Sequence, residues 1–434
     1  KVRKEIFVGP GVVNLKLQEA VAPENLFFAP DPGSQKASTI GGNVGTNAGG
    51  PHCLKYGVTS NNIAGLDLVL PNGQSISIRT SDPGYDLVSL FVGSEGTLGV
   101  VTGITLKLLP IPAYVRTMIV SFNSIEEAIQ SVTDIIAAGI LPATLEAMDR
   151  TTVAAVEAFM HAGYPLEAEA VLLIEVDGSE RLELENQIER IKNVCEKNNS
   201  FQTQIAKNEE ERKKLWEGRR GSYAAMARLA PNVLVEDGAV PRTKLPEALR
   251  EIKNIAEEEG LQVALLFHAG DGNLHPQIIF DERDENQTKV VKKAGYRMLK
   301  ACVDLGGTIS GEHGIGIDKR DAMKWLFTRE TLSLFRRIKV EFDPQNICNP
   351  DKLIPLVSKN QKEEAPKEDE NIKESLLGLA SPTTQEELIH VVQSWSKDRR
   401  QFGIQGSGTK YQVRENQIVT TKDLKKILDF DQGN

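Results

Sequence analysis

The two histidines of the segment FHAGDGNLHP, His268 and His275, have a spacing that suits a β-hairpin. A shared helix face would need histidines four residues apart. A strand ending at Phe267 and a strand starting near Leu274, joined by residues 269–273, would instead bring both imidazoles to the turn end of the hairpin. Because imidazole is a common metal ligand, the pattern predicts two ligands of one metal ion. The alternative is a pair of solvated loop histidines.

A carboxylate and an imidazole are neighbours further along the chain, as Glu312 and His313 in GGTISGEHGIG. Two histidines and one glutamate, with a fourth position left open, form a known type of catalytic zinc site. Adjacent side chains on an extended segment point to opposite sides, so we expect only one of these two residues to join the histidine pair. With Glu312 on the metal, His313 is available as a base beside the substrate.

Two glycine-rich segments offer backbone that can approach a ligand closely. They are DPGSQKASTIGGNVGTNAGG over residues 31–50 and GSEGTLG over residues 93–99. Glycine lets the backbone come near a ligand, and free N–H groups in such loops bind phosphates or the polar edge of a ring. Neither segment is a P-loop or a Rossmann fingerprint followed by a helix. We interpret them as ligand-lining loops, with tight surface turns as the alternative.

The elements that must position these residues change in type along the chain. In residues 1–110, which hold 16 of the 36 glycines, short apolar runs predict strands at 64–70, 75–78 and 99–109. From residue 114 onward strands and helices alternate. Strands are predicted at 115–121, 169–176, 261–267 and 276–280, and helices at about 124–139, 179–197, 241–260 and 285–305. We expect a domain of about 200 residues with an antiparallel or mixed sheet and helices on one face.

The C-terminal part begins with a polar, charged segment without aromatic residues at 357–374, which we interpret as a solvated linker. A capped helix from residue 383 and a strand at 402–405 follow, and the strand leads into IQGSGTK. This order predicts the start of a further domain. A glycine turn in a tail is the alternative for IQGSGTK.

The composition narrows the class of protein. With 434 residues, 40% of them hydrophobic and 26% charged, the chain is long enough for about two or three globular domains, and disorder as its main state is excluded. The 60 acidic and 51 basic residues give a net charge of −9, which argues against a nucleic-acid partner. No apolar run approaches about 18 residues, so no transmembrane segment is predicted. The four cysteines are far apart, which excludes a disulfide framework and suits a reducing compartment; they are Cys53, Cys195, Cys302 and Cys348.

Six segments, in this order and spacing, resemble the FAD-linked 2-hydroxy-acid dehydrogenase family of vanillyl-alcohol-oxidase-like flavoproteins. They are TIGGNVGTNAGG, KYGVT, GSEGTLGVVTGITLKL, HAGDGNLHP, GEHGIG and FDPQNICNPDKL. The resemblance covers roughly residues 1–356 and is strongest to the FAD-linked D subunit of glycolate oxidase and to D-lactate dehydrogenases. The C-terminal segments SPTTQEELIHVV and IQGSGTK resemble the opening of a domain like that of the E subunit of glycolate oxidase.

The resemblance implies an α+β fold. A PCMH-type FAD-binding domain, incomplete at its N-terminus because the family's GGGT loop would precede it, is joined to a ferredoxin-like α+β substrate or cap domain. The expected parts are the C-terminal portion of the FAD-binding domain, the cap domain with the metal site, a return to the FAD domain, a linker, and the start of a second FAD-binding-type domain. Their residues are 1–110, 111–330, 331–356, 357–374 and 375–434.

The family's FAD contacts can be carried over residue by residue onto the two glycine-rich loops and one later position. They would be Gly33, Ser34, Ser38, Thr39, Gly42, Thr46, Asn47, Ala48, Gly49, Ser94, Glu95, Gly96, Thr97, Leu98, Gly99, Val100 and Asn349. Asp351 stands where relatives often have glycine, so we expect an altered local turn. His52 follows the first loop and is expected to be structural, so the resemblance implies non-covalently bound FAD.

The family's metal ligands match His268, His275 and Glu312, with Zn²⁺ as the expected divalent metal, and its active-site histidine matches His313. The implied reaction is FAD-dependent oxidation of a small D-2-hydroxy acid, glycolate or D-lactate, to the 2-oxo acid. Hydride passes to the flavin with metal assistance. Two alternatives remain: a zinc hydrolase with the same cluster and no flavin, and a non-catalytic flavoprotein assembly subunit.

The arginine that receives the substrate carboxylate in the family matches Arg219 in LWEGRRGSY, and its neighbour Arg220 is the alternative. Val235 stands where a relative that uses a hydroxy-dicarboxylate carries lysine. An unpaired second carboxylate is costly to bury, so we expect glycolate or D-lactate to be preferred over D-2-hydroxyglutarate.

The electrons must leave through another acceptor, because the chain has no cysteine run for an iron–sulfur cluster. An iron–sulfur partner subunit or a quinone is implied. The expected location is cytoplasmic, including peripheral association with the inner face of the membrane.

Overall fold

The computed structural model describes residues 4–356, 378–398, 400–401, 403–405, 417–420 and 427–431. The chain forms two compact units. Unit 1 comprises residues 1–48, 58–110 and 313–434, and unit 2 comprises residues 49–57 and 111–312. The compact units therefore divide at 110/111 and 312/313, whereas the sequence-based domains divide at 110/111 and 330/331. Among the described residues, no helix is long and apolar enough to cross a membrane.

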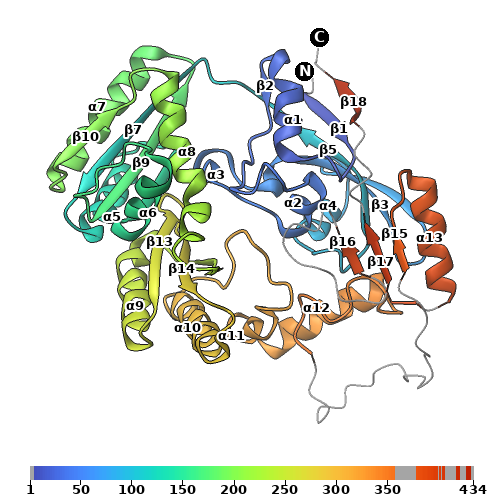
Figure 1. The fold of residues 1–434 in the computed structure, drawn as a ribbon. Helices are drawn as coiled ribbons and strands as arrows, with labels where there is room; N and C mark the ends of the chain where they lie inside the picture. The colour runs from blue at the N-terminus through green and yellow to red at the C-terminus, as the bar shows by residue number, and fades with distance from the viewer. Residues whose placement is uncertain are drawn as a thin grey trace. The chain divides into compact units, whose positions relative to one another are not determined.

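Unit 2 is built on an antiparallel sheet of eight strands in the order β10-β7-β9-β8-β13-β14-β11, with β12 also paired to β14 (Figure 1). The strands are β7 (Tyr114–Phe122), β8 (Thr144–Asp149), β9 (Ala170–Gly178), β10 (Gln202–Ile205), β11 (Asn232–Val235), β12 (Gly238–Ala239), β13 (Gln262–His268) and β14 (Asn273–Phe280). The strands predicted from the apolar runs at 115–121, 169–176, 261–267 and 276–280 are all present.

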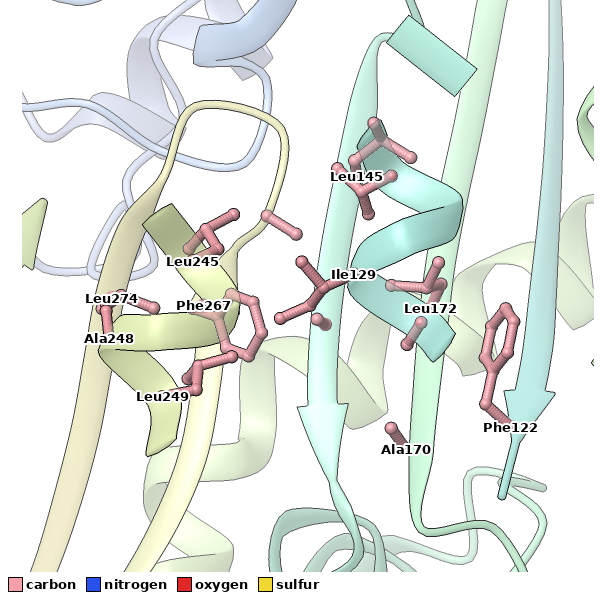
Figure 2. Packing of buried hydrophobic residues seen from close by; sticks show 14 of the residues in the cluster. Phe122, Ile129, Leu145, Ala170, Leu172, Leu245, Ala248, Leu249, Phe267 and Leu274 are labelled. Atoms are coloured by element: carbon pink, nitrogen blue, oxygen red, sulfur yellow. The ribbon is translucent and has the colours of Figure 1, made fainter. Parts of the chain in front are cut away.

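Helices cover both faces of this sheet, so the expectation of helices on one face was wrong. One core cluster joins the sheet to α5 (Ile125–Ala137), α7 (Arg181–Lys197), α9 (Leu245–Glu258) and α10 (Glu285–Asp304). Figure 2 shows Phe267 of β13 in this cluster beside Leu245 and Leu249 of α9. The second cluster joins the opposite face to α6 (Arg150–Met160) and α8 (Glu209–Met226). Because both faces are covered, every residue of β9 from Ala170 to Asp177 is buried.

Smaller elements complete unit 2. The short helix α3 (Cys53–Tyr56) lies in the 49–57 segment, and the 3-10 helix η3 (Arg242–Lys244) precedes α9. Ser124 caps α5, because its side chain accepts a hydrogen bond from the Glu127 N–H.

Unit 1 contains a five-stranded antiparallel sheet in the order β18-β1-β5-β3-β4 (Figure 1). Its strands are β1 (Glu5–Val8), β3 (Ile63–Val69), β4 (Ser75–Arg79), β5 (Val100–Lys107) and β18 (Ile427–Asp431); β2 (Leu26–Phe27) pairs with β6 (Leu109–Pro110). The helices of this unit before residue 357 are α1 (Asn14–Val21), η1 (Ala22–Glu24), α2 (Ile40–Thr46), η2 (Thr59–Asn62), α4 (Leu87–Phe91), η4 (Arg320–Ala322), α11 (Met323–Leu326) and α12 (Arg329–Phe342). Phe91 of α4 and Phe342 of α12 meet edge to face, with ring centroids 5.3 Å apart.

The C-terminal segment belongs to unit 1 in the structure. Strands β15 (Gly378–Ala380), β17 (Gln417–Thr420) and β16 (Gly403–Gln405) form a parallel sheet, and α13 (Gln385–Lys397) buries Leu388 and Val392 against residues of β3 and β5. Strand β18 pairs antiparallel with β1. The predicted linker at 357–374 and the glycine turn of IQGSGTK lie outside the described residues. The interpretation of 375–434 as the start of a second FAD-binding-type domain stays a prediction.

Candidate active site

Strands β13 and β14 form a hairpin that brings two histidines together in unit 2. Leu266 pairs with His275 and His268 pairs with Asn273, so both histidines lie at the turn end. Their ring centroids are 5.1 Å apart and their planes are perpendicular. Both side chains are buried. The interpretation of these residues as solvated loop histidines was therefore wrong.

Glu312 adds a carboxylate to the histidine pair. The segment that carries Glu312 is held by Asp237, a fully buried residue that no sequence motif marks. The Asp237 carboxylate accepts hydrogen bonds from Ser310 Oγ at 2.6 Å and from the Glu312 N–H at 3.1 Å. Glu312 Oε1 then lies 3.3 Å from His268 Nε2 and 3.2 Å from His275 Nε2. The structure thus brings Glu312, His268 and His275 together in one buried cluster.

The geometry of this cluster fits a metal ion. Its three ligand atoms lie within 4.8 Å of one another. Tetrahedral zinc with bonds of about 2.0–2.1 Å would hold its ligand atoms about 3.3 Å apart, close to the separations from Glu312. Each histidine uses its other nitrogen in an orienting contact, His268 Nδ1 with Glu146 Oε1 at 2.6 Å and His275 Nδ1 with the Glu236 carbonyl at 3.4 Å. Such contacts fix the tautomer that leaves Nε2 for the metal.

Opposite charges hold the cluster together. Burial raises the pKa of Glu312, but the two imidazoles outweigh this and hold that pKa well below its usual value. Burial lowers the pKa of His268, but the carboxylates of Glu146 and Glu312 outweigh it and raise that pKa well above 6.5.

Glu146 links the cluster to the predicted substrate arginine. It lies on β8 directly opposite His268 of β13, and its side chain is fully buried. Its Oε2 accepts a hydrogen bond of 2.6 Å from Arg219 Nε and forms an ion pair with Arg219 Nη2. Burial raises the pKa of Glu146, but Arg219 and His268 outweigh it and lower that pKa. The sequence signal for this residue is an acidic side chain in the interior of the strand TLEAMD, which also ends on an acidic residue, Asp149.

Arg219 reaches this position because α8 packs closely on its neighbours. A Cβ at Gly218 would lie 2.6 Å from Ala162 Cβ, and one at Gly221 would lie 2.1 Å from Met160 Sδ. Glycine inside a helix lowers stability by about 0.5–1 kcal/mol relative to alanine. At these two positions it nevertheless allows α8 to approach its neighbours closely. Arg219 is buried, whereas Arg220 is exposed and its guanidinium stacks 4.9 Å above Trp216. The geometry favours Arg219 over Arg220 as the substrate ligand.

A second carboxylate cluster in unit 2 lies around Glu175 of β9. This carboxylate accepts hydrogen bonds from Arg212 Nε at 2.9 Å and from Trp216 Nε1 at 2.7 Å, and His52 Nε2 lies 3.4 Å away. Thr117 Oγ1 donates a further bond at 2.5 Å. His52 also stacks on Trp216, with ring centroids 5.4 Å apart. These contacts support the expected structural role of His52.

The two glycine-rich loops lie together in unit 1. The Gly93 N–H donates to Val44 O at 2.8 Å and the Glu95 N–H donates to Gly45 O at 2.9 Å. Residues 40–46 form the helix α2, which the sequence pattern had indicated to be a loop, and Thr39 caps it through a bond from the Gly42 N–H. This helix contains glycines and is capped by polar residues at both ends, so its composition is that of a loop.

Several features of these loops fit a bound flavin nucleotide. Among the described residues, Ser38 Oγ and Asn43 Nδ2 are buried without a hydrogen-bond partner. Space lies open beside Gly33 and Gly45, where an added Cβ would meet nothing within 4 Å. Buried polar groups normally have partners, so these orphaned groups next to open backbone suit a polar ligand.

The remaining predicted FAD residues have mixed positions. Leu98 and Val100 are buried in core clusters, so only their backbone can reach a ligand. Gly49 belongs to unit 2, where a Cβ would lie 2.7 Å from Glu312 Oε2. Asn349 Nδ2 donates to Glu95 O at 2.6 Å, and Asp351 adopts a φ of 60°. Asp351 therefore keeps the left-handed turn that glycine favours, at some cost in strain.

The other predicted FAD residues are held mainly by local backbone contacts. Thr46 Oγ1 donates to Gly42 O, Asn47 Oδ1 accepts from the Ser60 N–H, Ala48 O accepts from Thr59, and Thr97 Oγ1 donates to Ser94 O. Gly33 and Ser34 are exposed, and Gly96 and Gly99 each lie against neighbouring atoms that leave no room for a larger side chain.

The chain after Glu312 is anchored to the second glycine-rich loop. The N–H groups of Ile315 and Gly316 donate to the Glu95 carboxylate at 2.6 and 2.8 Å. His313 directly follows Glu312 and is the first residue of this part of unit 1.

Comparisons with known proteins agree with these features. A family model for the C-terminal domain of FAD-linked oxidases matches residues 111–353, and a model for an FAD-binding domain matches residues 1–79. The chain is 44% identical over 353 residues to glycolate oxidase subunit GlcD of Escherichia coli (strain K12), covering 81% of this chain and 70% of that protein. It is 34% identical over 358 residues to D-lactate dehydrogenase of Anaerostipes hadrus, covering 79% and 74%.

Among solved structures, p-cresol methylhydroxylase with bound substrate is similar at a TM-score of 0.64 and 12% identity, covering 82% of this chain and 78% of that one. This likeness concerns the fold alone. It confirms the predicted α+β fold class, and the two family models support its assignment to flavoproteins.

Proposed function

Because the chain belongs to the FAD-linked oxidase family, we propose that it oxidises a small D-2-hydroxy acid, glycolate or D-lactate, to the 2-oxo acid. The observation that carries this proposal is the position of Arg219 and His268 on the two oxygens of one buried carboxylate, Glu146. The Arg219 guanidinium, which can bind the substrate carboxylate, then lies close to the metal ligand set formed by His268, His275 and Glu312. The named activities of similar proteins supply the substrate class.

Arg219 binds the substrate carboxylate in this proposal. Its Nε and Nη2 are bound to Glu146, and its Nη1 makes no hydrogen bond to any described residue. The edge formed by Nη1 and the second N–H of Nη2 can take a carboxylate in two parallel bonds. His313 accepts the hydroxyl proton at a ring nitrogen.

His268, His275 and Glu312 would hold the divalent metal, with Zn²⁺ the first candidate, and the loops at 31–50 and 93–99 with Asn349 would hold FAD. When bound, the metal supplies a Lewis acid for the α-hydroxyl and FAD supplies the hydride acceptor. Asp237 and Glu146 keep the ligands in place through the contacts described above.

The electrons leave through a separate acceptor in this proposal. The four cysteines form no disulfide, and the sequence has no cysteine run of the kind that holds an iron–sulfur cluster. An iron–sulfur partner subunit or a quinone would serve. The name of the similar Escherichia coli protein, a subunit of glycolate oxidase, supports a partner subunit.

A visible absorption spectrum of the purified protein tests the proposal against its two alternatives. Flavin bands that bleach on anaerobic addition of glycolate or D-lactate are expected. Flavin bands that no hydroxy acid bleaches would favour a non-catalytic assembly subunit. Bound zinc without flavin, together with hydrolase activity, would favour the zinc hydrolase.

Steady-state kinetics with three acids test the substrate size. Val235 of β11 lies opposite Gln277 of β14, and neither residue offers a cation. Arg242 Nη1 is bound to the Gly270 carbonyl at 3.3 Å. We expect kcat/KM for D-2-hydroxyglutarate to be at least about tenfold below that for the better of glycolate and D-lactate, because its second carboxylate would be desolvated without a partner. An equal or higher value would contradict this proposal.

A further inference from the structure

Glu146 occupies a position that joins two binding functions. One of its oxygens meets His268 Nδ1 and the other meets Arg219 Nε, each at 2.6 Å. It makes no other side-chain hydrogen bond to the described residues. A single fully buried carboxylate therefore sets the orientation of a proposed metal ligand and of the proposed substrate ligand.

The two partners depend on Glu146 in different ways. His268 must carry its proton on Nδ1 if its Nε2, which lies 3.3 Å from Glu312 Oε1, is to bind a metal. The Glu146 carboxylate accepts that proton's hydrogen bond. Arg219 must present one edge of its guanidinium to a substrate. The hydrogen bond from Nε and the ion pair of Nη2 with Glu146 fix which edge remains.

We propose that Glu146 is a positioning residue that couples the metal to the substrate carboxylate, so that each ligand strengthens the binding of the other. This inference rests on the proposed function. A metal that draws electrons from His268 strengthens the bond from Nδ1 to Glu146, which orders the carboxylate and with it Arg219. A carboxylate bound to Arg219 orders the same group from the other side. By linkage, the two affinities must change by the same factor.

A purely structural role for Glu146 would leave no such coupling, and the chain offers a matched control for it. Glu175 lies on the adjacent strand, is equally buried, and also binds an arginine of α8 and a histidine. It has no contact with the cluster of His268, His275 and Glu312 among its hydrogen bonds. The substitution Glu175→Gln therefore removes a comparable buried charge without touching the proposed coupling.

The experiment measures Zn²⁺ affinity of the metal-depleted, flavin-containing protein by competition with a chromophoric chelator, with and without saturating isobutyrate. This acid has the carboxylate that Arg219 would bind but no hydroxyl to offer the metal, and it cannot be oxidised, so its effect on Zn²⁺ affinity reports the path through Glu146. In the unmodified protein we expect the acid to strengthen Zn²⁺ binding by about five- to tenfold. In Glu146→Gln we expect Zn²⁺ affinity to fall by about 10- to 100-fold and the effect of the acid to fall below about twofold.

The controls separate the possible failures. Glu175→Gln should show the Zn²⁺ affinity and the coupling of the unmodified protein. Arg219→Lys keeps the charge but loses the planar fork, so it should retain Zn²⁺ affinity and lose most of the coupling; it tests the inference even if Glu146→Gln does not fold. Tight Zn²⁺ binding with no effect of the acid in the unmodified protein would overturn the coupling alone. Absence of Zn²⁺ binding in that protein would overturn the proposed metal site.

Discussion

Unit 2 contains two buried glutamates with the same kinds of partner. Glu146 on β8 and Glu175 on the adjacent β9 each bind a histidine and an arginine of α8. The two arginines, Arg219 and Arg212, are seven residues apart and so lie on the same side of the helix. In both cases burial raises the pKa of the carboxyl, but the cationic partners outweigh it and lower that pKa.

The two clusters differ in what surrounds the shared donor set. Glu175 receives further bonds from the Trp216 indole and the Thr117 hydroxyl, and Trp216 also stacks on His52. Among the described residues, Glu146 is bound only by its histidine and its arginine, and the second ring nitrogen of that histidine lies close to Glu312. Residue types alone therefore do not separate a structural ion cluster from a candidate active site. Two geometric features separate them. One is the number of hydrogen-bond donors to the carboxylate, and the other is the direction in which the second ring nitrogen of the histidine points.

The largest expected difference between the clusters concerns their histidines. We expect His268→Ala to remove bound metal and to lower kcat by at least about 10³-fold, because the metal supplies several kcal/mol of charge stabilisation. His52→Ala should leave metal content and kcat within about twofold and should lower only stability. Metal analysis and steady-state kinetics on both variants measure this. Full turnover in His268→Ala would contradict the assignment of the Glu146 cluster to the active site.

The same pair tests how FAD is held. Acid precipitation of the unmodified protein and of His52→Ala should release the flavin into the supernatant in both cases, because His52 is engaged by Glu175 and Trp216. Yellow colour that remains in the pellet of the unmodified protein but not in that of the variant would make His52 an attachment residue.

The two arginines give the next largest difference. Arg219→Lys should lower kcat/KM by about 100-fold, mainly through KM, because lysine cannot form two parallel bonds to a carboxylate. Arg212→Lys should leave the kinetics unchanged and lower the free energy of unfolding by about 3 kcal/mol, since Glu175 would lose part of its pairing. Kinetics and urea unfolding of both variants decide this. Equal kinetic losses in the two variants would show that the clusters are not distinct in role.

The sequence predicts those parts of the site that depend on local pattern. The hairpin of β13 and β14 and the meeting of its two histidines follow from a strand–turn–strand pattern within a few residues. Glu146 is 122 positions from His268, and only the pairing of β8 with β13 brings them together. Asp237 likewise meets residues 310–312 through the tertiary fold. No local periodicity carries such contacts.

The fold shows the same limit. Four of the eight strands of unit 2, β7, β9, β13 and β14, and its helices α5, α7, α9 and α10 were predicted, because each has its own apolar pattern. The coverage of the second sheet face by α6 and α8 was not foreseen, because a strand buried on both faces, such as β9, reads only as a continuous apolar run. The glycines at 218 and 221 that bring α8 close to its neighbours acquire meaning only from the packing.

Removal of the Trp216 hydrogen-bond donor to Glu175 should have a smaller effect, which is on stability. Trp216→Phe keeps the aromatic surface under His52 and Arg220 but removes the Nε1 donor that lies 2.7 Å from Glu175. Leaving part of a buried carboxylate unsatisfied should lower the free energy of unfolding by about 2 kcal/mol. The kcat should not change. Urea unfolding with parallel kinetics measures both, and a loss of kcat would show that this cluster also serves the active site.

The smallest effect concerns a third carboxyl, Asp149, which caps α6 at the end of the strand that carries Glu146. Its partners are the N–H and hydroxyl of Thr152, at 2.8 and 2.7 Å, and no cation binds it among the described residues. Burial raises the pKa of Asp149 to about 6, and the bonds from Thr152 offset this only in part. The comparison of Asp149 with Glu146 and Glu175 shows how far the arginine and histidine partners lower the pKa of a buried carboxyl.

The pKa of Asp149 is higher in the folded protein than the 3.8 of an ordinary aspartate, so folding takes up a proton there between about pH 4 and pH 6. Stability therefore falls as pH rises through this window, and the full penalty is present above about pH 6. Asp149→Asn keeps the capping oxygen without the charge. We expect the variant to be more stable than the unmodified protein by about 1 kcal/mol at pH 7.5, and equally stable at pH 4, by urea unfolding. The same difference in the free energy of unfolding at both pH values would mean that Asp149 is solvated well enough to ionise at its ordinary pKa. Burial without a cationic partner would then not raise the pKa of Asp149 above those of Glu146 and Glu175.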